Sequence, residues 1–446
     1  MNRLLPLLAS FVFVVPVISA ELWPQFRGPT GDGIASTAKA PTHWSENENI
    51  VWKTPVAGRG WSSPVVADGI VYLTTAVEET PSEEERLAAL EQKGENPKHY
   101  KQKHIAKAIT LGLVSLDLAS GEIKRKVDLV RLESPDAIHI VNSYSSPTPV
   151  IQGDLIYCHF GTFGTICLNR HEMTEVWRRR LPLEHSVGPG SSPFVYEDLL
   201  VLICDGVDRQ YVTALDRKTG ETLWEAERPE MDAPTGDQKK SFDTPIAITD
   251  ALGRNQLICM GSQWLVSYDP ASGKELWKVR HGKGFSVVPR PVYSDGVVYI
   301  STGFGKPQLW AISVDGSGDV SDTHVRWVET KGIPAKPSPL VVGDHIFVIS
   351  DDGIASCFAK ADGELLWKER IGGKYSASPL LAGNLIYVVS ESGKTTVVQP
   401  GDAYQMVAQN QLDGHFMASP AAISGFMLVR SATALYRIGA EDEESK

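Results

Sequence analysis

Short runs of apolar residues recur along the chain, and each run is opened by a small polar residue and proline and closed by a tight turn. In one such unit, Ser378-Pro379-Leu380-Leu381 begins a strand, Ala382-Gly383-Asn384 forms the turn, and Leu385-Ile386-Tyr387-Val388-Val389 forms a second strand. Proline suits the start of a strand, and glycine suits a tight hairpin. The pattern therefore predicts short antiparallel strands throughout the chain.

The same unit occurs eight times, with one copy degraded. The prolines that open the copies are Pro64, Pro147, Pro193, Pro245, Pro291, Pro339, Pro379 and Pro420. Apart from a first step of 83 residues, these prolines lie 40 to 52 residues apart. A period of about 40 to 50 residues with four short strands in each unit is typical of a β-propeller. We therefore expect an all-β fold with eight blades.

The two ends of the chain complement one another. The last unit, 417–438, supplies only three strands. Asn49-Ile50-Val51-Trp52-Lys53 precedes the first unit and carries a Trp at the place where other units end in Trp. Pairing of this N-terminal strand with the last blade would close the ring, and closure removes exposed sheet edges. We expect the N-terminal strand to complete the eighth blade.

A turn of the form Asp-x-x-Thr/Ser-Gly precedes a Trp in several units. Asp216 can accept hydrogen bonds from backbone amides two residues on, and Gly220 can take the left-handed conformation. Trp224 follows, and large rings at this position are predicted to fill the gap between neighbouring blades.

Two segments interrupt the repeat. Residues 78–108 contain Ser82-x-x-Glu85, a capping box in front of Arg86-Leu87-Ala88-Ala89-Leu90, and predict a helical insertion in the first blade. Residues 128–142 lengthen the crossing to the second blade. The expected organisation is a signal peptide at 1–20, an N-terminal extension at 21–48, the propeller at 49–440 and an acidic tail at 441–446.

The N-terminus predicts export. Met1 to Ala20 contains Arg3, the apolar run Phe11-Val12-Phe13-Val14-Val15 and the small residues Ser19-Ala20, which is typical of a cleaved secretory signal peptide. The run is too short to span a membrane, and no Cys follows it. We expect a protein of the periplasm or the extracellular space without a membrane span or a lipid anchor. Its net charge of −11 argues against binding of nucleic acid.

The five cysteines show no spacing typical of metal ligands. Cys158 and Cys167 flank the turn at 161–164 symmetrically. They could form a disulfide across a hairpin in an exported protein, or they could be two buried small hydrophobic residues.

Ala214-Leu215-Asp216-x-x-Thr219-Gly220-Glu221-x-x-Trp224 and its copies resemble the pyrroloquinoline quinone (PQQ)-like repeat family of β-propellers, over nearly all of the mature chain. Trp23-Pro24-Gln25-Phe26-Arg27-Gly28-Pro29-x-Gly31-x-Gly33 resembles the N-terminus of exported, mostly uncharacterised members. The resemblance implies either a non-enzymatic scaffold, like the outer-membrane assembly propeller, or a quinoprotein dehydrogenase with a quinone, calcium, an Asp base and vicinal cysteines. The chain has neither an adjacent Cys pair nor a Cys-x-x-Cys-His haem site.

The segments that precede the inner strands of a propeller lie at one mouth of its channel, so their side chains are candidates for ligand binding. Each segment carries a cationic or imidazole group, namely Arg59, His139, His185, Lys240, Arg290, Lys336, Lys374 and His415. Such a ring would attract an anion. Further candidates are Trp61 as a flat surface, Asn142 in the crossing to the second blade, and Asp205 and Asp208 as a base or metal ligands, although packing and turn stabilisation are alternatives.

We therefore expect a monomeric, exported, non-enzymatic propeller that binds or scaffolds a protein partner or a small anionic ligand at the channel mouth, without a cofactor. The alternative is a PQQ- or metal-dependent oxidoreductase that uses PQQ and Ca²⁺. Motifs for nucleophilic hydrolysis, such as Gly-x-Ser-x-Gly, are absent from the sequence.

Overall fold

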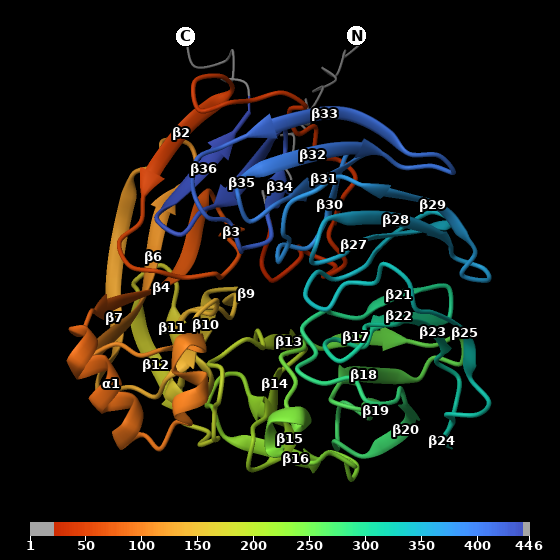
Figure 1. Cartoon of the computed structure of the whole chain (residues 1–446), viewed down its shortest axis with the longest axis horizontal. Helices are drawn as coiled ribbons and strands as arrows, with labels where there is room; N and C mark the ends of the chain where they lie inside the picture. The colour runs from red at the N-terminus through yellow and green to blue at the C-terminus, as the bar shows by residue number, and fades with distance from the viewer. Residues whose placement is uncertain (1–21, 440–446) are drawn as a thin grey trace, which may run out of the picture.

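A computed structural model describes residues 22–439, so the predicted signal peptide at 1–20 and the acidic tail at 441–446 lie outside the described residues. Eight antiparallel sheets surround a central axis (Figure 1). The prediction of an eight-bladed β-propeller is confirmed. Within residues 22–439, no helix is both long enough and apolar enough to cross a membrane.

Each blade has four strands that follow one another in the chain from the axis outwards. Blade 1 contains β3 (Val65–Ala67), β4 (Ile70–Glu79), β6 (Ala108–Asp117) and β7 (Ile123–Glu133), and blade 2 contains β9 (Val150–Gln152), β10 (Leu155–His159), β11 (Thr165–Asn169) and β12 (Thr174–Arg179). Blade 3 contains β13 (Phe194–Tyr196), β14 (Leu199–Asp205), β15 (Gln210–Asp216) and β16 (Thr222–Glu227), and blade 4 contains β17 (Ile246–Thr249), β18 (Asn255–Met260), β19 (Trp264–Tyr268) and β20 (Glu275–Arg280).

The second half of the ring has the same order, except that the outer strand of the last blade comes from the N-terminal part of the chain. Blade 5 contains β21 (Val292–Ser294), β22 (Val297–Ser301), β23 (Leu309–Ser313) and β25 (Val325–Glu329), and blade 6 contains β26 (Leu340–Val342), β27 (His345–Ile349), β28 (Ile354–Ala359) and β29 (Leu365–Arg370). Blade 7 contains β30 (Leu380–Ala382), β31 (Leu385–Val389), β32 (Lys394–Gln399) and β33 (Gln405–Gln411), and blade 8 contains β34 (Ala421–Ile423), β35 (Phe426–Arg430), β36 (Ala434–Ile438) and β2 (Ile50–Pro55).

Each inner strand begins directly after a proline. One of the predicted blade-opening prolines, that of blade 2, is therefore corrected. Strand β9 begins at Val150, so Pro149 opens the second blade, and the prediction of Pro147 is wrong by two residues. The segment Pro147-Thr148-Pro149 offers two prolines, and only the later one directly precedes the strand. Thr148 therefore takes the place that serine has in most other blades.

The ring closes as predicted. Strand β2 pairs in antiparallel fashion with β36, with Trp52 opposite Arg437 and Lys53 opposite Tyr436. In Figure 1 the N-terminal strand β2 lies beside the C-terminal strand β36. The outer strand of blade 8 thus comes from the opposite end of the chain, which leaves no unpaired blade edge at the junction.

The repeated Trp residues lie between blades, as predicted, and their contacts explain the repeated glycine. The indole N–H of Trp224 in blade 3 donates to the carbonyl of Pro270 in blade 4, at 2.9 Å. Gly273 in the same turn has φ +70°, and a Cβ atom on it would lie 2.5 Å from the Trp224 ring. The equivalent pairs are Trp52 with Gly121, Trp177 with Gly220, and Trp327 with Gly363. Glycine is required here both for its conformation and for the space that the indole occupies.

Trp277 of blade 4 lacks this contact. Residues 314–324 of blade 5 form a longer loop, in which β24 (Gly318–Asp319) pairs in parallel with β20 at the outer edge of blade 4. The indole N–H of Trp277 donates instead to Oε1 of Gln256, at 2.7 Å. A polar contact within blade 4 thus replaces the contact with a turn glycine.

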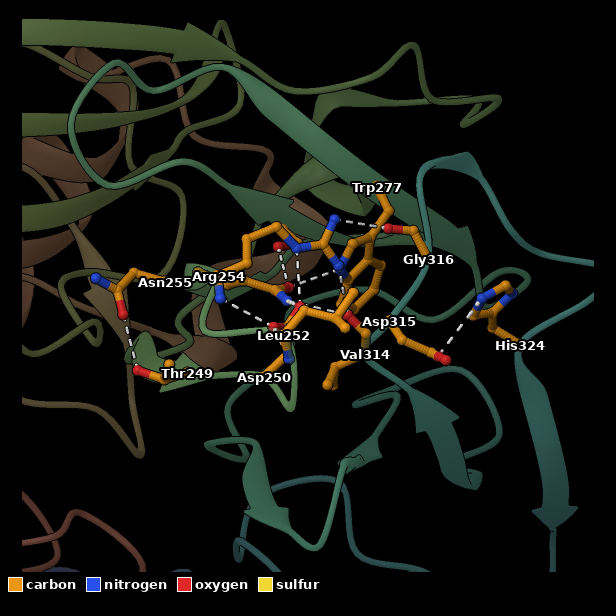
Figure 2. Close-up of polar contacts among 12 residues, drawn as sticks. Thr249, Asp250, Leu252, Arg254, Asn255, Trp277, Val314, Asp315, Gly316 and His324 are labelled. Carbon is orange, nitrogen blue, oxygen red and sulfur yellow. Dashed lines mark hydrogen bonds and ion pairs between the residues drawn. The ribbon is translucent and has the colours of Figure 1, made fainter.

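A cluster of hydrogen bonds joins blades 4 and 5 at this place (Figure 2). Arg254 pairs with Asp250 at 2.9 Å. It also donates to the carbonyls of Val314 and Gly316, at 3.0 and 2.9 Å. The turn that carries Leu252 is fixed by these contacts, while the Leu252 side chain is 85% exposed.

The insertion in blade 1 is helical. Helix α1 (Glu83–Gln92) begins at the Ser82 capping box, and the 3₁₀ turn η1 (Pro97–Gln102) follows. Strand β5 (Lys103–His104) then pairs with β8 (Ile138–His139) on the crossing to blade 2. Leu90, Ile105 and Ala137 form a small apolar core that fixes the insertion to this crossing.

The state of the cysteines follows from strand register. Cys158 lies opposite Ile166, and Cys167 lies opposite Tyr157. Because neighbouring positions of a strand point to opposite faces, the two sulfur atoms lie on different faces of the blade and form no disulfide. All five cysteines are free and buried, so the interpretation as small hydrophobic residues is correct.

Residues 22–35, which we call the N-terminal plug, occupy one end of the central channel. Trp23 pairs in antiparallel fashion with Val66 of the inner strand β3. Strand β1 (Ile34–Ala35) pairs in parallel with the inner strand β30. All inner strands run in the same direction along the axis, so the plug enters the channel, turns between 26 and 33, and leaves by the same end.

Two buried arginines hold the turn of the plug. Arg290 donates to the carbonyl of Phe26 at 2.6 Å. A Cβ atom on Gly31 would lie 2.4 Å from Nη1 of Arg290, and one on Gly33 would lie 2.9 Å from Nη2 of Arg27. Burial lowers the pKa of Arg290 to about 10 and that of Arg27 to about 9. The Gly-x-Gly motif thus provides room for the two guanidinium groups.

Candidate functional site

A cavity of about 1110 Å³ opens at the other end of the channel. Phe26 of the N-terminal plug lines it, together with hydroxyl residues that precede the inner strands. Because the plug occupies the far end, the cavity is a closed-ended funnel and the channel does not pass through the molecule.

A ring of hydroxyl residues surrounds the axis below the mouth. Its members are the residues directly before the blade-opening prolines, namely Ser63, Thr148, Ser192, Thr244, Ser338, Ser378 and Ser419. The amide of Ser63 donates to the hydroxyl of Thr148 at 2.9 Å, and the amide of Thr148 donates to that of Ser192 at 2.9 Å. The same link from one blade to the next recurs between further members. The ring ties neighbouring inner strands together and gives the cavity a polar base.

The crossings around the mouth of the cavity differ in length. Three crossings between blades are long, and the insertion of blade 1 stands beside them on the same half of the mouth. The long crossings are 134–149, 180–193 and 228–245, and the short ones are 281–291, 330–339, 371–379, 412–420 and 56–64. The insertion and the long crossings therefore lie over blades 1 to 4, and the crossings over blades 5 to 8 are short.

Half of the predicted site residues line this cavity. They are Trp61, His139, Asn142, His185, Lys240 and Lys336. Asn142 is held by the next crossing, because its amide nitrogen donates to the carbonyls of Val187 and Pro189 at 2.8 and 3.0 Å. The structure thus brings together side chains from several crossings that are far apart in the sequence.

Three predicted residues lie beside the cavity. Arg59 donates to the carbonyls of Ile140 and Asn142 and so supports the first crossing. Lys374 and His415 line a separate shallow hollow at the rim. His415 packs edge-on against Trp61, with ring centroids 5.5 Å apart.

The other three predicted residues lie away from the cavity. Asp205 is buried and forms an ion pair with Arg228 at 3.0 Å, which occupies both of its oxygens. Asp208 accepts a hydrogen bond from the amide of Glu184 and stabilises a turn. Arg290, expected at the mouth, lies inside the channel because its side chain points away from the mouth to the N-terminal plug.

The cations of the cavity are paired, which changes the expected charge of the mouth. Four lysines line it, and each has a carboxylate partner. The pairs are Lys93 with Asp136, Lys103 with Glu95, Lys240 with Asp237, and Lys336 with Glu391, at 2.6 to 3.1 Å. The side chains therefore present neighbouring donors and acceptors in place of a ring of uncompensated positive charge.

The two predicted imidazoles that line the cavity add little positive charge. Burial lowers the pKa of His185 to about 4, and its Nε2 accepts a hydrogen bond from the amide of Thr162 at 2.9 Å. Burial also lowers the pKa of His139, and the charges of Lys103 and Lys240 lower it further. Both rings are neutral near pH 7.

Apolar side chains are exposed at the rim. Ile140 is 51% exposed, Val141 is 52% exposed and Phe304 is 38% exposed. Val141 and Phe304 line the cavity, and Phe304 contacts Phe285 with ring centroids 6.4 Å apart. The Trp61 indole donates to the carbonyl of Val141 at 3.1 Å and fixes its position. The mouth thus combines apolar surface with paired charges.

The residues do not fit a calcium–quinone centre. Among residues 22–439, no group of three or more His, Cys, Asp or Glu side chains could hold a metal ion. The carboxylates that line the cavity, such as Asp237 and Glu95, are already paired with lysines. The vicinal cysteines of the dehydrogenases have no counterpart in the sequence. No catalytic step through such a centre follows from this structure.

The carboxylate partners of the cavity lysines could not be identified from the sequence. Glu95 and Lys103 lie in the insertion, whose position relative to the mouth has no local sequence signal. Asp237 lies three residues before Lys240, and this short spacing was the one indication in the sequence that the two side chains form a pair. Ser186 contacts the lysines of both pairs.

The fold and the cavity define a PQQ-like repeat propeller with eight blades and a closed-ended channel. Residues 110–249 and 261–416 match the family model described as outer membrane protein assembly factor BamB, and the chain belongs to this family. A search of curated protein sequences gave no match.

Solved structures share the fold at low sequence identity. BamB from Moraxella catarrhalis is 16% identical, with a TM-score of 0.52, 76% of this chain covered and 94% of that one. A europium-containing methanol dehydrogenase is 11% identical, with a TM-score of 0.64 and coverages of 93% and 90%. The quinohemoprotein alcohol dehydrogenase from Comamonas testosteroni is 12% identical, with a TM-score of 0.62 and coverages of 95% and 81%. These similarities extend to both enzymes and BamB, so they show the fold alone.

Proposed function

We propose that this protein is an exported binding module that holds a segment of a partner protein in its central cavity. The observation that carries the proposal is the lining of the mouth, where every lysine is paired and the apolar Val141 and Phe304 are exposed. Binding surfaces for proteins combine exposed apolar side chains with polar groups that satisfy hydrogen bonds, and the mouth offers both.

The lining favours a polypeptide over a small anion. An anion would have to compete with Asp237 for Lys240 and with Glu95 for Lys103, and it would gain little from the neutral His185. A polypeptide offers both backbone donors and acceptors to the paired charges, and apolar side chains to the rim. Electrostatic complementarity of this kind selects a partner by arrangement of charge rather than by net charge.

Two further points support the proposal. The family model is described as an assembly factor of the outer membrane, which is consistent with a role in protein binding. The predicted signal peptide at 1–20 supports a location in the periplasm or outside the cell. Among residues 22–439, no group of three or more His, Cys, Asp or Glu side chains that could hold a metal ion supports the metal-dependent alternative.

The proposal is tested by photo-crosslinking in cells that produce the protein. p-Benzoylphenylalanine at position 304 should give a discrete adduct with another polypeptide, and Val141→Glu should abolish this adduct because it places a charge on the apolar rim. The control position is 252, which is also exposed but lies on the turn between β17 and β18 of blade 4 and does not line the cavity. The same adduct from position 252, or an adduct at 304 that persists in Val141→Glu, would contradict the proposal.

A further inference from the structure

The base of the cavity differs in polarity from its mouth. Phe26 of the plug and six of the seven ring hydroxyl residues line it, and each of the six is at most 7% exposed. These six are Ser63, Thr148, Ser192, Thr244, Ser378 and Ser419. The base is therefore lined chiefly by hydroxyl groups, whereas the mouth is lined by paired charges.

The hydrogen bonds of the ring leave most of its hydroxyl protons without an acceptor. In five of the six residues, all except Ser63, the hydroxyl oxygen accepts a hydrogen bond from an amide of the blade before it. A hydroxyl that accepts in this way still has one proton to donate. Ser378 donates its proton to the hydroxyl of Ser338 at 3.2 Å, but the other hydroxyls donate to no group within residues 22–439. The base thus offers several unused donors around the axis.

Three buried arginines add positive charge around this base. Arg290 occupies the ring position of blade 5, because its amide donates to the hydroxyl of Ser338 at 2.9 Å. Arg27 lies in the turn of the plug, and Arg430 donates to the carbonyl of Ser62, one residue before the ring, at 3.0 Å. The three guanidinium groups donate to uncharged acceptors, and in the described part of the chain none of them forms an ion pair.

Two carboxylates reduce this charge without cancelling it. Asp32 and Asp243 act on Arg290 from beyond the distance of an ion pair. Burial raises the pKa of Asp243 to about 7, so this carboxyl group is partly protonated near neutral pH. Three guanidinium groups are therefore accompanied by at most two carboxylates, whereas every lysine at the mouth has its own partner.

A carboxylate matches the chemistry of this base. It accepts hydrogen bonds without donating any, and it carries the charge that the buried arginines lack. Hydrogen bonds from hydroxyl groups to an ionised acceptor are also stronger than those between neutral groups. The ring itself consists of seven hydroxyl residues and Arg290, so it contains no carboxylate of its own.

The closed end of the channel favours the end of a chain. The plug prevents passage, so a polypeptide that reaches the base must end there or turn back. A turn presents backbone N–H and C=O groups alike and requires two passages of the chain through the mouth. A C-terminus requires one passage and ends in a carboxylate.

We propose that the base of the cavity is a binding site for the C-terminal carboxylate of a partner polypeptide, which enters the channel with its C-terminus first. The identity of this ligand rests on the proposed function, which places a polypeptide in the same cavity. The residues before the C-terminus then contact the apolar side chains and the paired charges of the mouth.

The test compares three mixtures of random hexapeptides with acetylated N-termini, built from uncharged residues. The first mixture has free C-termini, the second has C-terminal amides, and the third has C-terminal amides and one Glu at the third position. Equilibrium dialysis against the purified protein, with detection by mass spectrometry, should show at least tenfold stronger binding of the free acids than of either amide mixture. The net charge of −11 would by itself favour the uncharged amides, so this preference requires a local site.

Ser63→Ala removes one donor from the base. The Ser63 hydroxyl forms no hydrogen bond within the described residues, so its loss leaves the contacts of the fold unchanged. We expect about tenfold weaker binding of the free acids, because a hydrogen bond to a charged group is lost, and unchanged binding of the amides. The matched control is Ser356→Ala, because the Ser356 hydroxyl is also buried without a partner but does not line the cavity. It should bind the free acids like the parent protein.

Equal binding of free acids and amides, or no binding of any mixture, would overturn the carboxylate site. So would an equal loss in Ser63→Ala and Ser356→Ala. Binding of the Glu-containing amides as strong as that of the free acids would show that the base takes a side-chain carboxylate, and would overturn the assignment to a C-terminus. None of these results changes the crosslink from position 304, so failure of this site and failure of the proposed function are distinguishable.

Discussion

The contact between Trp and glycine can be tested by two glycines in the same blade. Gly273 lies in the turn between β19 and β20, and Gly253 lies in the turn between β17 and β18. Both have positive φ angles, +70° and +78°. A Cβ atom at Gly273 would lie 2.5 Å from Trp224, whereas a Cβ atom at Gly253 would meet nothing within 4 Å. Alanine at the two positions therefore differs only in the clash with the indole.

The expected difference in the free energy of unfolding between the two variants follows from two contributions. Alanine in the left-handed region costs roughly 1 to 2 kcal/mol, and this term applies to both variants. Insertion of a methyl group into a packed contact costs typically about 1 to 3 kcal/mol, and this term applies to Gly273 alone. We expect Gly253→Ala to lower the free energy of unfolding by about 1 kcal/mol and Gly273→Ala to lower it by about 3 kcal/mol.

Equilibrium unfolding in urea, followed by tryptophan fluorescence and by circular dichroism, measures the difference. Combination of Gly273→Ala with Trp224→Leu should reduce the cost of Gly273→Ala to that of Gly253→Ala, because the ring that it meets is gone. Equal losses for the two single alanine variants would refute the reasoning, since the repeated glycine would then be needed for its conformation alone.

Two further predictions concern buried charge. Burial lowers the pKa of His159 to about 3, below the value of about 6.5 for an unfolded chain, so stability is full above pH 6.5 and is lost as the pH falls towards 3. As the pH falls from 7 to 5, we expect the shifted pKa of His159 to lower the free energy of unfolding by about 2 kcal/mol. If the free energy of unfolding of His159→Gln depended on pH as steeply as that of the parent protein, this reasoning would be wrong. Arg290→Met leaves the carbonyls of Phe26 and Pro245 without their donor, so we expect a loss of about 3 kcal/mol and faster hydrogen exchange at 23–35. Unchanged exchange there would show that Arg290 does not hold the plug.

The fold could be predicted because it is repeated in the sequence. The spacing of the prolines and the complementary ends indicated eight blades and the β2–β36 pairing, since a propeller repeats one local unit. The one wrong position, Pro147, arose where two prolines stand two residues apart and only strand register distinguishes them. A hydroxyl residue precedes seven of the eight blade-opening prolines, and this pattern is visible in the sequence. Its hydrogen bond to the next blade depends on packing between repeats, which no single unit shows.

The candidate site was less predictable because its residues are not repeated. His185 and Lys240 were found from their place in the crossings, but Glu95 and Asp237, which neutralise the mouth, were not. Arg290 was assigned to the mouth because a cation before an inner strand has the right position in the chain. The direction of a long side chain along the axis depends on what fills the channel. The role of residues 22–35 as a plug gives no signal in the periodicity of the strands.

The mouth is asymmetric because the plug, the insertion of blade 1 and the long crossings are not repeated from blade to blade. The plug closes one end of the channel, so any occupant must arrive from the other. There Phe304 lies beside the short crossing 281–291, and the three long crossings lie over the other half of the ring. A symmetrical ring would present eight equivalent approaches and would fix no orientation for a polypeptide. The insertion and the three long crossings remove that equivalence, so the two halves of the ring offer different surfaces to a bound segment and can fix its orientation.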